Sequence, residues 1–264
     1  MDEIIDINHQ SVAVLPYYVD ETGDVYIFGE IKDENFYSEP YRNAFTFIGG
    51  NFKCGGSFKD DSPETTYFRI LFDETGAKEE NIKNESVGKD TYSTILNDSS
   101  IEIDTGYKLK PIKDMEEIGQ ILIDNPQYVA DYLVHVDDNE VVYNPIDYLS
   151  RIYTKQLSKE EFVKFQNIIN DNDGALTSDN KKYGSKTVCY KISDMNKFEI
   201  PFSWGYDLTL NMLIASGHIP SGENINDITL IGSVSVEDVT SKLSDCLTYK
   251  EFENAGYRYK NNNN

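Results

Sequence analysis

The chain has 264 residues, of which 39% are hydrophobic and 12% aromatic, and its formal net charge is −22 at pH 7. This apolar content is enough for a packed core, which excludes wholesale disorder, and the length suggests one large domain or one domain with an insertion. So acidic a chain repels nucleic-acid backbones and anionic lipid, and we expect no general nucleic-acid binding and no membrane partner. The N-terminus lacks a signal peptide and no apolar run reaches about 18 residues, which favours a cytoplasmic protein. Nothing in the sequence indicates the oligomeric state.

The first third of the sequence has the pattern of strands followed by one well-marked helix. Two β-rich runs separated by "DETG" predict a hairpin over residues 11–31, and "NAFTFIGGNF" predicts a further strand with a double glycine. Ser62 is a favourable N-cap, Pro63 suits the first helical position, and Gly76 suits the position after the last turn. These signals predict a helix from Pro63 to Thr75.

The remaining sequence mixes both kinds of periodicity. We predict helices over residues 112–123, 126–136 (whose end also fits a strand), 144–157, 158–171, 202–217 and 236–257, and strands over 92–97, 101–109, 187–192 and 227–236. The elements do not alternate strictly, so the pattern favours an α+β fold over a doubly wound sheet. We expect one domain over residues 1–260, with a mainly helical insertion at about 110–183 and a disordered tail at 261–264.

Acidic residues gather around the helix that begins at Pro63. Asp73 and Glu74 are adjacent and point about 100° apart, so both side chains can reach one site at the helix edge. Asp60 and Asp61 precede the helix and come close if the loop turns back. Acids at a helix C-terminus oppose the macrodipole, so their position favours a functional role over helix stability. Clustered carboxylate oxygens suit Mg²⁺ or Mn²⁺.

The segment from Gly55 to Ala77 resembles the Nudix box, whose pattern is Gly-x5-Glu-x7-Arg-Glu-U-x-Glu-Glu-x-Gly-U with U a bulky aliphatic residue. The residues identical to the pattern are Gly55, Arg69, Leu71, Glu74 and Gly76, and Asp61 and Asp73 are the shorter acid. The preceding "FTFIGG" resembles the strand and double glycine that lead into the box. The resemblance implies an α/β/α sandwich around a mixed sheet. It also implies a metal-dependent hydrolase that cleaves the pyrophosphate of a nucleoside diphosphate linked to another moiety.

The same resemblance implies roles for individual residues. Asp73 and Glu74 would bind Mg²⁺ or Mn²⁺, Asp61 would support the metal site, and Arg69 would orient the loop and helix, with Glu74 and Arg69 as the catalytic pair. The candidate substrate-binding residues are Gly50, Gly55, Tyr18 and Trp204. For Tyr18, as for Tyr17, Phe28 and Tyr41, ordinary sheet packing is an equally good interpretation. Trp204 and Tyr206 could stack on a base, but their pattern favours a core anchor before the following helix.

Ile70 departs from the box, because the family has a metal-binding glutamate at this position. An isoleucine binds no metal, so two interpretations remain open. In one, another acid takes the glutamate's place, and the candidates are Glu79, Glu80, Asp137 and Asp138. In the other, catalysis is lost and the fold serves as a module that binds a nucleotide or a protein partner.

The cysteines and histidines show no metal-binding pattern. Cys54, Cys189 and Cys246 are far apart and odd in number, and no CxxC pair exists. We expect free thiols in a reducing compartment.

Overall fold

The computed structural model describes residues 4–32, 34, 36, 42–52, 60–74, 102–103, 107–108, 115–137, 145–171, 185–226 and 233–260. Its elements in chain order are β1 (Ile5–Ile7), β2 (His9–Val19), β3 (Val25–Lys32), β4 (Phe45–Thr46), β5 (Ile48–Asn51), α1 (Pro63–Glu74), β6 (Glu102–Ile103), β7 (Tyr107–Lys108), α3 (Met115–Ile123), β8 (Gln127–Val136), β9 (Ile146–Gln156), α4 (Lys159–Asp171), β10 (Ser185–Lys191), α6 (Ile192–Lys197), α7 (Tyr206–Ala215), β11 (Val234–Asp238), α8 (Thr240–Leu243), α9 (Tyr249–Asn254) and β12 (Tyr257–Tyr259).

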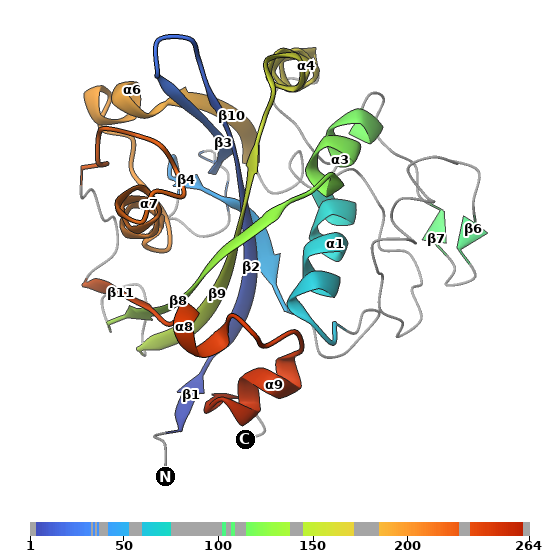
Figure 1. Ribbon diagram of the computed structural model, residues 1–264, viewed down its shortest axis with the longest axis vertical. Helices are drawn as coiled ribbons and strands as arrows, with labels where there is room; N and C mark the ends of the chain where they lie inside the picture. The colour runs from blue at the N-terminus through green and yellow to red at the C-terminus, as the bar shows by residue number, and fades with distance from the viewer. Residues whose placement is uncertain are drawn as a thin grey trace.

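A mixed, curled sheet forms the centre of the molecule (Figure 1). Its strand order is β10-β3-β2-β9-β8-β11, with β4 paired to β3 and β5 paired to β2. β2 and β9 run parallel, and the other pairs are antiparallel. β2 and β3 pair only near their hairpin turn, over residues 17–19 and 25–27, and then separate to pair with β5 and β4. That separation leaves room for a cavity beside the sheet.

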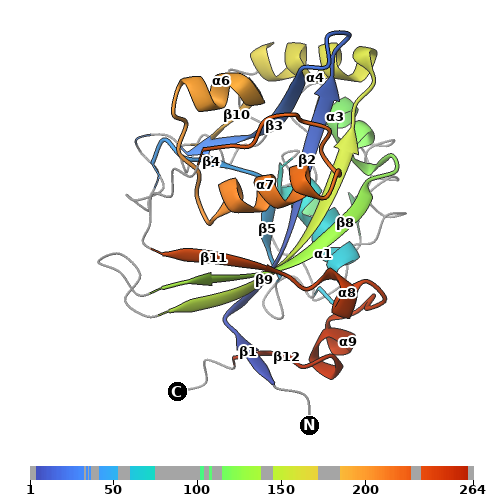
Figure 2. The same ribbon diagram turned by 60° about the vertical axis from the view of Figure 1, so that its left-hand side comes forward.

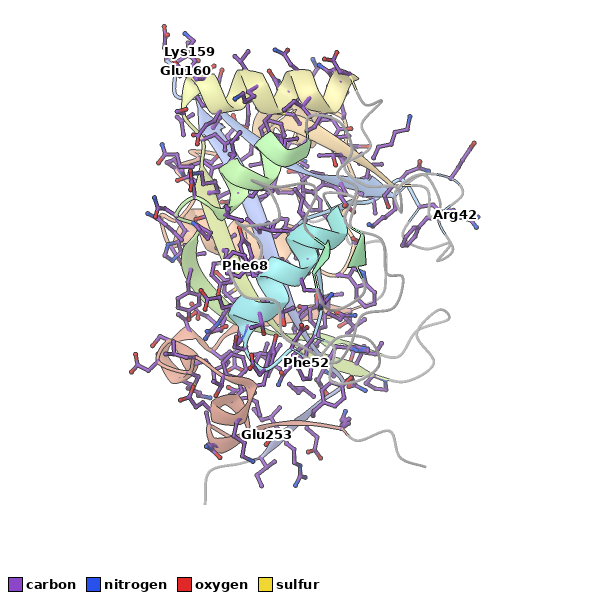
Figure 3. The ribbon with its side chains drawn as sticks, turned by 90° about the vertical axis from the view of Figure 1, so that its right-hand side faces the viewer. Arg42, Phe52, Phe68, Lys159, Glu160 and Glu253 are labelled. Atoms are coloured by element: carbon purple, nitrogen blue, oxygen red, sulfur yellow. The ribbon has the colours of Figure 1, made fainter. Side chains whose placement is uncertain are left out.

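Helices cover both faces of the sheet, because β2 sends apolar side chains to both. Val12 and Val14 join the core beneath α1, α3 and α4, whereas the alternate residues Ala13, Leu15 and Tyr17 join the core beneath α6 and α7. Figures 1 and 3 show the first helical layer, and the second lies across the sheet from it. The fold is therefore α+β, as expected, with a curled mixed sheet and helices on both of its faces. None of the described helices is long and apolar enough to cross a membrane.

Local signals located several elements correctly. The hairpin over 11–31 is confirmed, and Gly23 in its turn has a positive φ of 86°. Helix α1 begins at Pro63, where the backbone N–H of Thr65 donates to the capping Ser62 Oγ. A capping box opens α4, and Gly217, with φ of 74°, ends the segment that contains α7.

The predicted helices over 126–136 and 144–157 are wrong, because these segments form β8 and β9. β9 lies between β2 and β8 in the sheet, so the region at 110–183 is not a mainly helical insertion. Its helices α3 and α4 are confirmed, but they pack on the sheet that β8 and β9 help to build. Strands buried on both faces carry apolar residues almost continuously, and this pattern does not distinguish them from buried helices.

The C-terminal helix predicted over 236–257 is also wrong. The chain instead forms the end of β11, two short helices α8 and α9, and strand β12, which pairs in parallel with β1 (Figure 2). Ile7, Leu149, Phe252 and Tyr257 belong to the small core that holds this segment against the sheet. The C-terminal segment is therefore packed against both the first strand and the central strand β9.

A buried ion pair joins this C-terminal segment to the sheet. Arg151 on β9 lies directly opposite Asp131 on β8, and its Nε and Nη2 each donate to one carboxylate oxygen at 2.8 Å. The same guanidinium donates to the carbonyls of Leu243 and Cys246, at 2.7 and 2.8 Å. It also lies 4.8 Å from the centre of the Phe252 ring. Arg151 thus satisfies a buried acid and the end of α8 together.

We expect Arg151→Ala to lower the free energy of unfolding by about 3–5 kcal/mol, because it leaves Asp131 buried without its counter-ion. Urea unfolding followed by circular dichroism measures the change. The control is Lys250→Ala, which breaks an exposed pair with Glu253 and should change stability by less than about 0.5 kcal/mol. Equal effects of the two substitutions would contradict the importance of the buried pair.

Candidate functional site

The start of α1 is fixed by a buried acid–arginine pair. Arg69 donates from Nε to Asp60 Oδ1 at 3.0 Å and from Nη2 to Asp60 Oδ2 at 2.8 Å. Thr66, one helical turn earlier, also donates to Asp60 Oδ2 at 3.0 Å. Arg69 Nη2 donates in addition to the carbonyl of Asn51, at the end of β5. The pair therefore binds the helix to its own preceding loop and to the strand that carries the double glycine.

Helix α9 closes the same network from the other end of the chain. The hydroxyls of Thr66 and Tyr249 lie 2.6 Å apart, and the backbone N–H of Tyr249 donates to the carbonyl of Asp61 at 3.1 Å. Burial raises the pKa of Tyr249 well above its ordinary value, so its hydroxyl stays protonated and can donate. The loop before α1 is thus held from both sides.

Asp60, rather than Asp61, is the acid that pairs with Arg69. Asp61 is exposed, and its carboxylate accepts a hydrogen bond from the Thr65 hydroxyl at 3.1 Å. The orienting role of Arg69 and the supporting role of Asp61 at a metal site stay predictions. The contacts show that Arg69 pairs with Asp60 and that Asp61 does not share this pair.

Ile70 belongs to the core and does not line an open site. Its side chain is 3% exposed and packs with Val12, Ile48 and Leu71. A Cβ placed on Gly50 would lie 3.1 Å from Ile70 Cγ1, so the isoleucine fills the space where a side chain at position 50 would be. The position at which the box has a third carboxylate is therefore occupied by close apolar packing.

The other predicted metal ligands are not placed. The helix backbone continues through Asp73 and Glu74, but their side chains, together with Gly55, Glu79, Glu80 and Asp138, lie outside the described residues. Asp137 is described, and its carboxylate lies 2.9 Å from Nε2 of His135 at the end of β8. Among the described residues, no cluster of three or more His, Cys, Asp and Glu could hold a metal ion.

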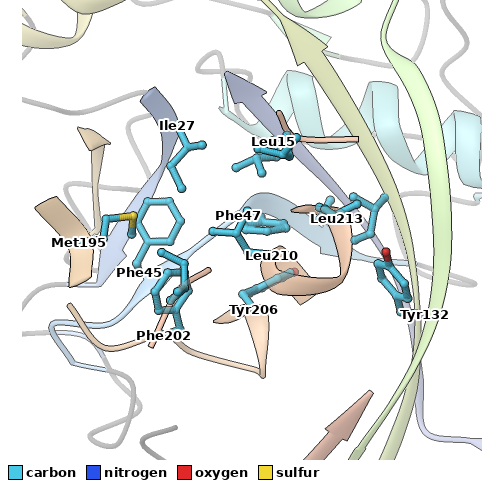
Figure 4. Close-up of a cluster of buried hydrophobic side chains, with 14 of the residues drawn as sticks. Leu15, Ile27, Phe45, Phe47, Tyr132, Met195, Phe202, Tyr206, Leu210 and Leu213 are labelled. Carbon is cyan, nitrogen blue, oxygen red and sulfur yellow. The ribbon is translucent and has the colours of Figure 1, made fainter. Parts of the chain in front are cut away.

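A cavity of about 220 Å³ lies where β2 and β3 separate. Its lining comes from both strands, from β4 and β5 with the turn between them, from β9 and from the start of α7. The lining residues are His9, Ser11, Glu30, Lys32, Phe36, Thr46, Phe47, Gly49, Gly50, Asn51, Tyr148, Trp204 and Tyr206. Phe47 and Tyr206 stack with ring centres 4.4 Å apart and also belong to the core cluster of Figure 4. The cavity lining therefore combines aromatic side chains with polar and charged ones.

The double glycine of β5 lets the chain fit between this cavity and neighbouring elements. A Cβ on Gly49 would lie 2.6 Å from the carbonyl of Val12, so only glycine allows this close pairing with β2. Gly50 lines the cavity and touches Ile70, and Asn51 lines it while its carbonyl binds Arg69. Strand β5 therefore lines the cavity and also contacts helix α1.

Charged groups occupy one part of the cavity lining. Glu30 on β3 is 4% exposed, and its Oε2 accepts a hydrogen bond from Lys32. Its Oε1 is buried and has no hydrogen-bond partner. His9 also lines the cavity, and burial lowers its pKa below the ordinary value, so its imidazole is neutral at pH 7. The lining thus presents a carboxylate oxygen, an ammonium group and a neutral imidazole.

Trp204 is held in an unusual backbone conformation at the cavity. Its φ is 57°, in the left-handed region that non-glycine residues rarely adopt, and Gly205 follows with φ of 67°. The hydroxyl of Tyr148 donates to the Trp204 carbonyl, and the two rings meet edge to face with centres 6.0 Å apart. Such conformations persist where surrounding contacts fix them, and they concentrate at functional sites.

Of the substrate-binding residues predicted from sequence, Gly50 and Trp204 line the cavity together. Tyr18 does not, because it packs in the opposite core, stacked on Phe162 with ring centres 4.3 Å apart. Sequence reasoning missed His9, Glu30 and Lys32. The available signal was Glu30, an acid inside the otherwise apolar run "VYIFGEI".

The described cysteines are free, as predicted. Cys189 and Cys246 form no disulfide, and Cys54 lies outside the described residues. Burial raises the pKa of the Cys189 thiol to about 12, so it is a poor nucleophile at neutral pH.

Comparison with known proteins adds little to this geometry. No family model matches the chain, and no curated protein matches it. Among solved structures, a Nudix hydrolase from M. Smegmatis, RenU, is similar to this chain with a TM-score of 0.26 and 9% sequence identity. The match covers 59% of this chain and 70% of that chain. So low a score supports no functional conclusion.

Asp60 and Asp61, the two adjacent acids before α1, allow a matched test of the buried pair between Asp60 and Arg69. We expect Asp60→Asn to lower the free energy of unfolding by about 2–4 kcal/mol, because it removes the charge of a buried ion pair with Arg69. Asp61→Asn removes only an exposed acceptor and should change it by less than about 0.5 kcal/mol. Chemical unfolding of both variants measures the difference; a larger effect at Asp61 would restore it as the acid of the frame.

Proposed function

We propose that the chain is a Nudix-like module that binds a small nucleotide-derived ligand in the cavity beside Trp204. In this proposal the protein binds the ligand without hydrolysing it. The observation that carries this proposal is the burial of Ile70 against Gly50. At the position where the Nudix box has a metal-binding glutamate, this chain has a side chain that packs in the core and cannot bind a metal.

The cavity supplies the binding half of the proposal. Ligand sites are concave, largely apolar and carry a few well-placed polar groups. Here the stacked rings of Phe47 and Tyr206 and the partly exposed Trp204 contribute aromatic side chains to the lining. Glu30 and Lys32 add opposite charges within the same lining. Planar rings bind such aromatic surfaces well, and a nucleobase is the planar group of a nucleotide.

Metal-dependent hydrolysis is the second candidate. It is favoured by the intact frame, in which Arg69 and Asp60 hold the start of a helix whose backbone continues through Asp73 and Glu74. In this candidate those two acids would hold Mg²⁺ or Mn²⁺, and the ligand would be a nucleoside diphosphate linked to another moiety. The buried isoleucine does not fit a third ligand, so we assign no step of a reaction to the metal.

One titration separates the two candidates. Trp204 is the only tryptophan in the chain, so its fluorescence reports directly on the cavity. We expect ADP-ribose, NAD, a dinucleoside polyphosphate or ADP to change this fluorescence with a Kd in the micromolar range, roughly −8 kcal/mol, with or without Mg²⁺. Chromatography of the same mixtures should show no hydrolysis products.

Two results would reverse this order. Turnover that requires Mg²⁺ or Mn²⁺ and is lost in Glu74→Gln would establish the hydrolase. A lack of any fluorescence change or any heat in calorimetry across the panel would remove the binding proposal.

Substitutions at Ile70 test whether the position is structural. We expect Ile70→Glu to destabilise the fold by about 3 kcal/mol or more, because it buries a carboxylate without a partner, whereas Ile70→Leu should cost less than about 1.5 kcal/mol. Thermal unfolding in EDTA and in excess MgCl₂ measures both. Stability equal to that of the parent in Ile70→Glu without metal would show that the position is open. Recovery by Mg²⁺ in Ile70→Glu, but not in Ile70→Gln, would show that the neighbouring acids still form a metal site.

A further inference from the structure

Glu30 is a buried carboxylate with one oxygen left unsatisfied. Its Oε2 accepts from Lys32, whereas Oε1 has no hydrogen-bond partner, and the residue lines the cavity. A buried oxygen without a donor is unfavourable by about 1–3 kcal/mol, and more when it is charged. Such atoms are uncommon in folded proteins, and each calls for a partner. A donor on a bound ligand would satisfy Glu30.

Lys32 places a positive charge beside that acceptor. Its ammonium group is held by Glu30 and lies 5.2 Å from the centre of the Phe36 ring. Because Glu30 Oε2 already accepts from Lys32, the acceptor left for a ligand is Glu30 Oε1. Its complement is an N–H donor on the ligand.

The aromatic groups restrict that ligand to a flat ring. Trp204 has a fixed backbone and an indole packed against Tyr148, so its orientation is set before any ligand binds. A ring that stacks on a rigid indole gains about 1–3 kcal/mol per base in known single-strand complexes. A flat ring with an N–H donor at its edge is the chemistry of a nucleobase.

We propose that Glu30 is the specificity-determining residue of this cavity: its Oε1 accepts a ring or amino N–H of a nucleobase, and the ring stacks against Trp204. This inference rests on the proposed function, because it names the group that the binding module recognises. It places the phosphate end of the ligand away from Glu30, since two anionic groups repel each other in a buried site.

The test uses pairs of nucleotides that differ in the order of donor and acceptor. ADP offers an amino donor beside a ring-nitrogen acceptor, whereas IDP offers a ring N–H beside a carbonyl acceptor; CDP and UDP form the same kind of pair. In Glu30→Gln the amide oxygen can still accept from Lys32, so its N–H₂ group takes the place of Oε1. That change replaces an acceptor with a donor while it keeps the shape of the side chain.

We expect the parent protein to favour one member of a pair, and Glu30→Gln to change the affinity ratio of that pair by at least about tenfold. Trp204 fluorescence gives the affinities, and circular dichroism checks the fold. Glu160→Gln is the matched control, because Glu160 is exposed on α4 in the other helical layer and should leave every ratio unchanged (Figure 3).

A second measurement needs no variant. Methylation at the donor nitrogen of the preferred nucleotide, as in N1-methyl-IDP or N6,N6-dimethyl-ADP, should weaken binding to the parent protein by at least about tenfold. The role of Glu30 would be overturned if nucleotides bind but the affinity ratio is unchanged in Glu30→Gln and methylation has no effect. That result would still agree with the proposed binding function. Failure of all four nucleotides to bind the parent protein would remove the proposed function as well.

Discussion

The buried guanidinium of Arg69 is the contact on which the rest of this site depends. It neutralises Asp60 in the loop before α1 and bonds the carbonyl of Asn51 at the end of β5. Asn51 and the two glycines before it form part of the cavity wall. Since Tyr249 fixes the same loop from the C-terminal segment, the cavity wall, the first helix and the last helix share one network. We therefore expect a substitution at any of these groups to alter the shape of the cavity, even where the substituted residue does not line it.

Ile70 shows how one position serves either packing or chemistry, but not both. Full burial of an isoleucine side chain contributes about 1.5–3 kcal/mol, and this gain requires an apolar neighbour on every side. A carboxylate at the same position would need solvent, a cation or several donors. Gly50 offers only backbone and a surface that the isoleucine fills. The packing that stabilises the helix here is thus incompatible with an unpartnered acid.

Sequence reasoning succeeded where local chemistry decides the structure. The hairpin turn at Gly23, the cap at Ser62 and the stop at Gly217 each depend on a few neighbouring residues. It failed for β8 and β9, whose residues are buried on both faces and whose charges are satisfied only across the pair. Asp131 and Arg151 are 20 residues apart and meet only in the sheet, so neither segment alone shows why a charge is tolerated there.

The same limit explains which site residues could be predicted. Gly50 and Trp204 stood in recognisable patterns, whereas Lys32 resembled an ordinary charged residue at a strand end and Glu30 was marked only by its apolar neighbours. Only the separation of β2 from β3 turns them toward an enclosed space.

Three buried carboxylates show what distinguishes structural acids from a recognition group. Asp60 and Asp131 each receive donors on both oxygens, from an arginine and from a neighbouring hydroxyl. Both oxygens of each acid already accept hydrogen bonds within the fold, so these acids need no donor from a ligand. Glu30 has donors on one oxygen alone, and the other faces no partner. Glu30 is the one of the buried acids described here that lines the aromatic cavity, so its unsatisfied oxygen is the acceptor to which a ligand's donor is directed.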